Sequence, residues 1–76
     1  MNYERGVSMK LDRVKLITEM ARNGVSCKEL VERSGLSRLT VTNVRNGKSC
    51  TKSTAIAIAK AIGVEMSQIV EEVDSE

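Results

Sequence analysis

Residues 34–49 read SGLSRLTVTNVRNGKS, and this stretch decides which fold the sequence predicts. Its middle, TVTNV, is rich in β-branched side chains, which usually favour strands. A strand would alternate its faces, but Asn43 then falls among the apolar residues and Val44 among the polar ones. In a helix, Val41 and Val44 are three residues apart and share one face. Because periodicity is stronger evidence than propensity, we expect a helix over residues 38–46.

The residues just before this helix predict a second helix and a tight turn. Ser26 and Glu29 have the spacing of a capping box, in which each side chain bonds the backbone amide of the other residue. The helix that begins there covers residues 27–34 and ends at Gly35. Two short helices joined by a turn that contains glycine form the skeleton of a helix-turn-helix.

Three further helices complete the expected fold. Apolar residues spaced three and four apart predict the first, over residues 10–23, with Ser8 as a candidate N-cap. Thr51 caps the fourth helix, over residues 52–62, and residues 66–72 form the last. Six apolar residues of the first helix are expected to share one face: Leu11, Val14, Leu16, Ile17, Met20 and Ala21. No segment predicts a credible strand, so the expected fold is all-α, a compact five-helix bundle.

The chain of 76 residues is long enough for one domain. We expect a flexible arm over residues 1–9, the folded domain over residues 10–73 and a frayed acidic tail over residues 74–76. Charge is unevenly distributed, because residues 1–63 hold all 12 basic residues and residues 64–76 hold five acids and no base. A basic body with an acidic tail fits a domain that binds a polyanion, although an ordinary solvated surface gives the same balance.

The composition argues against several classes of protein. The two cysteines, Cys27 and Cys50, are far apart in sequence and the chain has no histidine, so we expect no metal site. Neither thiol has a histidine partner, and no phosphate-binding glycine motif is present, so we expect no enzyme activity and no cofactor. No apolar run is long enough to cross a bilayer and no secretory signal is visible, which points to the cytoplasm.

The segment SCKELVERSGLSRLTVTNVRNGK, followed by IAKAIGVEMSQI, resembles the Cro/phage-repressor type of helix-turn-helix regulators, the XRE family. The resemblance runs from about Leu11 to Val70 and includes the Ser26 cap, Gly35 and Ser37 in the family's order. It implies a lambda-repressor-like domain of five helices, in which the second and third helices form the helix-turn-helix. It also implies sequence-specific binding of double-stranded DNA, with the third helix in the major groove.

By position, the resemblance implies five base-contacting residues, which are Ser37, Arg38, Leu39, Thr42 and Asn43. Arg38 can donate two hydrogen bonds to guanine, and Asn43 can pair with adenine. Thr42 offers a hydroxyl and a methyl group. Leu39 has two interpretations, since it either contacts a thymine methyl or closes the small core.

A second group of residues is expected to contact phosphates. The amides of Cys27 and Lys28 lie at the start of the second helix, where free N–H groups and the helix dipole attract anions. The loop after the third helix supplies the other candidates, which are Asn46, Lys48, Ser49, Thr51 and Lys52. Each basic side chain in this group is equally consistent with plain solvated charge.

The sequence also departs from the family pattern. Relatives often have a glutamate where Arg45 stands, paired with a base on the first helix. Here the charge is reversed, so Arg45 either binds a phosphate or pairs with Glu19 or another acid. Relatives often carry a glutamine near Cys27 that braces the recognition helix, and we expect this brace to be missing. Val31 stands where many relatives have alanine.

The resulting hypothesis is a small transcriptional regulator, by family default a repressor, acting on a near-palindromic operator. One helix offers few contacts, so a homodimer is expected at least on DNA. The dimer contact would come from Met66, Ile69 and Val73, unless these simply belong to the core. We expect no membrane partner and no small-molecule ligand. The alternative is a protein-interaction module on the same fold, such as an antitoxin-like or anti-repressor partner.

Overall fold

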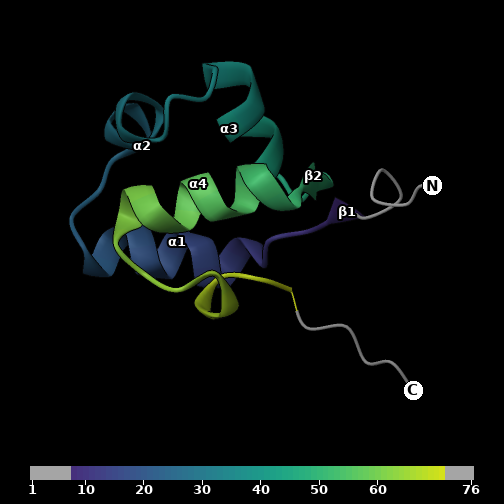
Figure 1. Cartoon of the computed structure of the whole chain (residues 1–76). Helices are drawn as coiled ribbons and strands as arrows, with labels where there is room; N and C mark the ends of the chain where they lie inside the picture. The colour runs from purple at the N-terminus through teal and green to yellow at the C-terminus, as the bar shows by residue number, and fades with distance from the viewer. Residues whose placement is uncertain (1–7, 72–76) are drawn as a thin grey trace.

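Four α-helices lie within residues 8–71, the part of the chain that the computed structural model describes (Figure 1). They are α1 (Arg13–Arg22), α2 (Cys27–Ser34), α3 (Arg38–Arg45) and α4 (Lys52–Ile62). Each begins after a polar cap whose side chain accepts a hydrogen bond from the amide three residues further on; these caps are Asp12, Ser26, Ser37 and Thr51. The expected bounds of the second, third and fourth helices are confirmed to within one residue.

The expected start of the first helix is wrong, and so is the expected cap at Ser8. Asp12 caps α1, because its carboxylate accepts from the amide of Lys15 at 3.0 Å. The preceding residues are extended instead, and Ser8–Met9 forms strand β1. This strand pairs antiparallel with β2 (Cys50–Thr51), so the expectation of no strand is also wrong. Strands of two residues are too short to leave a periodic pattern in the sequence.

The expected fifth helix is wrong as well. Met66–Gln68 forms only a 3₁₀ helix, η2, after which the chain is extended and Val70 bridges Leu11. The amide of Asp12 donates to the carbonyl of Ile69 at 2.8 Å, so a neighbouring segment satisfies the backbone there. Val73, one of the three residues expected to form the dimer contact, lies outside the described residues.

The hydrophobic core lies between the helices and the bridge from Leu11 to Val70, which pairs the two ends of the described chain. Figure 1 shows α4 crossing the middle of the molecule, with α2 and α3 on one side and α1 on the other. The largest fully buried side chains are those of Leu11, Leu16, Leu30, Val41, Val44, Ile58 and Ile69. Small side chains on α4 leave room for its neighbours, and Ala55 and Ala59 are both buried. Burying these apolar side chains is the main force that holds the fold.

The apolar residues of α1 do not share one face. Leu16 and Met20 point into the core together with Glu19. Val14 is 72% exposed and Ile17 is 39% exposed, because their positions fall on the opposite side of a helix with 3.6 residues per turn. Within residues 8–71, no helix is long and apolar enough to span a membrane.

Expectations that concern residues 1–7 and 72–76 fall outside the described residues. They include most of the N-terminal arm and the whole of the tail over residues 74–76. The domain bounds 10–73 stay a prediction. Strand β1, at Ser8–Met9, precedes the expected first residue of the domain.

Candidate nucleic-acid interface

One face of α3 points away from the core and carries the side chains expected to contact bases. Val41 and Val44 hold the inner face and are almost completely buried. Leu39, Thr42 and Asn43 lie on the opposite side, because they are three and four residues apart. Leu39 is 69% exposed, which rules out its interpretation as a core residue. The recognition face, defined as these three residues and Arg38, is therefore available to a partner.

The polar groups of the recognition face are largely free of internal partners. Among the described residues, the side-chain amide of Asn43 makes no hydrogen bond. Only its backbone carbonyl is engaged, since it accepts from the backbone amide of Lys48 at 3.0 Å. Arg38 is the first residue of α3 and is exposed. Thr42 is half-buried. An amide and a guanidinium without internal partners can pair with base edges at no cost in protein hydrogen bonds.

Ser37 is more constrained than the sequence indicates. Its hydroxyl oxygen accepts from the amide of Thr40 at 3.1 Å and donates its hydrogen to Thr40 Oγ1 at 2.9 Å. The cap of α3 thus uses the only hydrogen of this hydroxyl. Ser37 retains the capacity to accept one further hydrogen bond but not to donate one.

The loop between α3 and β2 presents a row of exposed polar residues. Its backbone folds tightly, since the amides of Gly47 and Lys48 donate to the carbonyls of Val44 and Asn43 at 3.0 Å each. The candidates for phosphate contact in and after this loop are all exposed: Asn46, Lys48, Ser49, Thr51 and Lys52. Thr51 also caps α4 by accepting from the amide of Thr54 at 3.2 Å. This cap leaves the first backbone amides of α4 free, and Lys52 is the first residue of that helix.

The start of α2 is organised by its capping box. The amide of Ser26 donates to Glu29 Oε1 at 2.9 Å, and the amide of Glu29 donates to Ser26 Oγ at 3.1 Å. The Ser26 amide holds the pKa of the Glu29 carboxyl below its ordinary value. The amides of Cys27 and Lys28 have no acceptor among the described residues, which leaves two donors at the positive end of the helix dipole.

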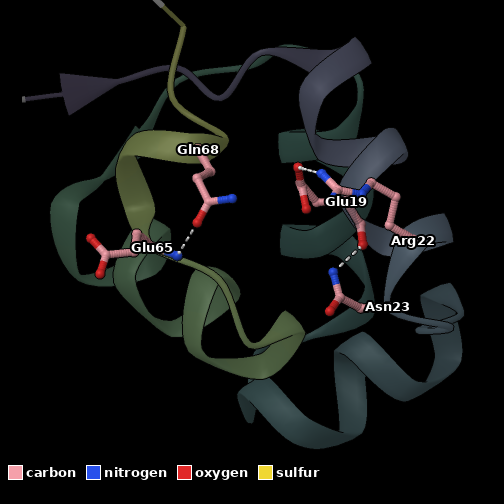
Figure 2. A network of polar contacts seen from close by, with 5 residues as sticks. All are labelled: Glu19, Arg22, Asn23, Glu65 and Gln68. Atoms are coloured by element: carbon pink, nitrogen blue, oxygen red, sulfur yellow. Dashed lines mark hydrogen bonds and ion pairs between the residues drawn. The ribbon is translucent and has the colours of Figure 1, made fainter.

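Arg45 lies against this end of α2. Its Nη1 donates to Cys27 Sγ at 3.8 Å, and its Nε is buried with no hydrogen-bond partner in the described part of the chain. The expected pairing with Glu19 does not occur. Glu19 is only 8% exposed and pairs instead with Arg22, whose Nη1 lies 3.1 Å from its carboxylate (Figure 2). Relatives often brace the recognition helix with a glutamine near Cys27, which this chain lacks. The hydrogen bond from Arg45 to Cys27 partly replaces that brace.

Electrostatics favour an anionic partner on this side of the molecule. Residues 33–64 contain no aspartate or glutamate, and this range includes α3, the loop after it and α4. Four basic residues of this range belong to α3, the loop after it and the start of α4, and they are Arg38, Arg45, Lys48 and Lys52. Such a concentration of one sign of charge attracts polyanions.

The family model of the Cro/C1-type HTH DNA-binding domain matches residues 15–75. The chain belongs to this family. The match covers most of the chain, and α2 and α3 lie within it. Among curated proteins, none matches the sequence.

Two solved structures share the fold of this Cro/C1-type domain. They are native PhpD with cadmium atoms and PhpD with cadmium complexed with hydroethylphosphonate. Each superposes with a TM-score of 0.72 at 22% sequence identity and covers 88% of this chain. The chain spans only 15% of the length of PhpD, so the likeness concerns the fold alone.

The contact between Arg45 and Cys27 is the feature of this Cro/C1-type domain that sequence reasoning missed. The two residues are 18 positions apart, and the sequence offers no carboxylate partner that would flag Arg45 as buried. The one available signal was the pair of coincident departures from the family pattern, at Arg45 and near Cys27. Two departures that meet in space indicate a replacement of one contact by another.

Proposed function

We propose that this Cro/C1-type domain is a transcriptional regulator of the cytoplasm that reads an operator with α3 in the major groove. The observation that carries the proposal is the recognition face. It combines an exposed leucine with an arginine and an asparagine that lack internal partners, in a range without carboxylates. Arg38 pairs with guanine, Asn43 with adenine, and Leu39 and Thr42 contact methyl groups. Ser37 contributes only as an acceptor.

Phosphate contacts on both sides of α3 fix its depth and register in the groove. On one side are the free amides of Cys27 and Lys28 at the start of α2. On the other are the exposed residues of the loop and of the start of α4, which are Asn46, Lys48, Ser49, Thr51 and Lys52. These contacts supply affinity without sequence information.

We infer repression as the mode of action, because a small DNA-binding domain that occupies an operator blocks access to it. A near-palindromic operator would be bound by a homodimer, since one recognition helix offers few base contacts. Ile69 is fully buried in the single chain and is therefore a core residue rather than a dimer contact. Met66 packs against the core but keeps some exposure, so it is the better candidate for the dimer interface.

Selection of bound sequences from a random DNA pool tests this function. We expect one enriched motif for the wild-type chain, with two related half-sites. Asn43→Ala should relax the preference at one position of each half-site, whereas Lys60→Ala, an exposed change on α4, should leave the motif intact. Enrichment of no motif would overturn the regulator proposal. A motif unchanged by Asn43→Ala would overturn the role of Asn43 alone.

The alternative, a protein-interaction module, is favoured by one observation. Val14 and Ile17 form an exposed apolar stripe on α1 together with Ala21, which is also exposed. Exposed apolar stripes of this kind occur at protein interfaces. Salt dependence distinguishes the two functions, because a steep loss of DNA affinity with rising salt and a strong preference for one sequence are properties of the regulator alone.

A further inference from the structure

Arg45 is a charged side chain without a charged partner. Among the described residues it makes one weak bond, to the thiol of Cys27, and none of the ion pairs includes it. The buried Nε has no acceptor. A half-buried cation of this kind is costly unless an acceptor completes its hydrogen bonds.

The surroundings of Arg45 increase this cost. Cys27 is the first residue of α2, so the guanidinium lies beside the positive end of a helix. The free amides of Cys27 and Lys28 lie at the same end. The nearest carboxylate on α2 is directed elsewhere, because Glu29 Oε1 accepts from the amide of Ser26 and Glu29 Oε2 lies 3.9 Å from Arg33. The Glu29 carboxylate thus lies at this end of α2, but the Ser26 amide and Arg33 already engage it, and no ion pair joins it to Arg45.

An anion at the start of α2 would accept from the two free amides and from the Nη atoms of Arg45, whereas the buried Nε stays out of its reach. A phosphate oxygen matches the planar donor edge of a guanidinium and the free amides of a helix end. In the proposed complex, the start of α2 already faces the DNA backbone. Arg45 lies on the flank of α3 that contacts α2, so it reaches the same phosphate from the opposite side.

We propose that Arg45 binds one phosphate of the DNA backbone together with the amides of Cys27 and Lys28, while the Cys27 thiol orients the guanidinium. This inference rests on the proposed DNA-binding function. It gives Arg45 two tasks, since the same side chain braces α3 against α2 and fixes the helix-turn-helix on the backbone. Arg45 is thus a positioning residue for sequence reading by Arg38 and Asn43, and it reads no base itself.

The test pairs a protein variant with a change in single phosphates. Arg45→Gln keeps a hydrogen-bonding group beside Cys27 but removes the charge. Operators that carry an uncharged methylphosphonate at one position at a time remove single phosphate charges. We expect one position at which the methylphosphonate weakens the wild-type chain more than Arg45→Gln, whose remaining sensitivity comes from the amides of Cys27 and Lys28.

Salt dependence gives a second readout of the same contact. Loss of one phosphate contact lowers the slope of log affinity against log salt by about 0.9. Between about 50 mM and about 200 mM salt, the affinity of Arg45→Gln should therefore fall about 3.5-fold less than that of the wild type. Arg45→Lys keeps the charge and should keep the slope. Lys60→Gln, which removes a charge from the exposed side of α4, is the control and should also keep it.

The outcomes separate this inference from the function on which it rests. If the wild type binds its operator with a steep salt slope and Arg45→Gln has the same slope and the same methylphosphonate profile, Arg45 is only a structural brace. If the wild type prefers no sequence, the proposed function itself fails. Circular dichroism identifies variants that do not fold. Should Arg45→Gln be one of them, Arg45→Lys decides the question, because it keeps the charge and must keep both the salt slope and the sensitive methylphosphonate position. Loss of either in a folded Arg45→Lys would overturn the inference.

Discussion

Glu29 is the residue whose ionisation is most directly coupled to local structure. Its carboxylate accepts from the amide of Ser26, which lowers its pKa, and Arg33 adds a smaller effect in the same direction. A carboxyl whose pKa is lowered by folding stabilises the fold above the ordinary carboxyl pKa. That contribution is lost as the pH falls through the lowered value. The cap of α2 should therefore weaken in acid.

Glu29→Gln should reduce the acid sensitivity of the fold. A glutamine oxygen can still accept from the Ser26 amide, but the neutral side chain lacks the stabilisation that the carboxylate charge adds at neutral pH. The variant should therefore start less stable at neutral pH and converge with the wild type in acid. Urea unfolding measured from neutral pH down to about pH 3 should show a smaller loss of stability for the variant than for the wild type. Glu32→Gln removes the same charge from an exposed position on the same helix and serves as control. Identical pH profiles for Glu29→Gln and the wild type would contradict the prediction.

Leu39 should contribute to DNA binding and not to stability. The side chain is 69% exposed, so Leu39→Ala should change the free energy of unfolding by less than about 0.5 kcal/mol. Replacing the contacted thymine by deoxyuridine removes only a methyl group and should weaken wild-type binding about fourfold. Leu39→Ala should be insensitive to that replacement in binding titrations. Val14→Ala, at the exposed position on α1, should remain as sensitive as the wild type.

At the scale of single residues, the sequence predicted inner positions better than surface ones. Val41 and Val44 are buried as their spacing indicates, because both lie on a short helix with one covered face. Val14 and Ile17 are exposed although they are apolar, since α1 has apolar residues on two sides and only packing decides which side is covered. Arg45 could not be placed, because its neighbour Cys27 is close only in the folded chain.

At the scale of elements, the turn between α2 and α3 sets the geometry of the helix-turn-helix. Gly35 ends α2 in the left-handed conformation, with φ of +75°, and its amide donates to the carbonyl of Val31 at 3.1 Å. A Cβ built on Gly35 would meet no atom within 4 Å, so space is not the constraint there. The constraint is conformational, since residues with a side chain rarely adopt this φ.

Gly35→Ala should destabilise the chain by about 1 kcal/mol, the ordinary cost of the left-handed conformation for alanine. For a domain of this size, that corresponds to a melting temperature lower by about 5 °C. Gly35→Asn should cost less, because asparagine tolerates this conformation better. Thermal unfolding followed by circular dichroism measures both. Equal losses for the two variants would show that φ is not the limiting factor.

The elements that the sequence predicted correctly are those with local signals. The Ser26 and Ser37 caps lie within three residues of the amides that they bind, so α2 and α3 could be bounded from the sequence. The 3₁₀ helix η2 could not, because Ile69 is buried equally well by a helix or by an extended segment. Its extended continuation depends on backbone bonds to Asp12, far away in sequence. The same holds for β1, whose partner β2 is about 40 residues further along the chain.

At the scale of the whole molecule, the segment that precedes α1 joins two distant parts of the chain. Ser8–Met9 pairs with β2, which lies between the proposed phosphate-binding loop and α4 (Figure 1). The backbone carbonyl of Lys10 accepts from the backbone amide of Glu71 at 2.9 Å, and Leu11 forms a β-bridge with Val70. Met9 also packs against the core. This segment therefore supports the proposed phosphate-binding loop through its pairing with β2.

A comparison of two truncations isolates the contribution of β1. One chain starts at Ser8 and keeps the strand, and the other starts at Lys10 and lacks it. The second should melt about 5 °C lower than the first, since it loses backbone hydrogen bonds and the packing of Met9. Its amides over residues 48–52 should exchange with solvent faster, because the loop loses its supporting strand. DNA affinity should fall for all sequences alike, since Lys48 and Lys52 are less well positioned while α3 is unchanged. A narrowed or shifted sequence preference would instead indicate that β1 acts on the recognition helix itself.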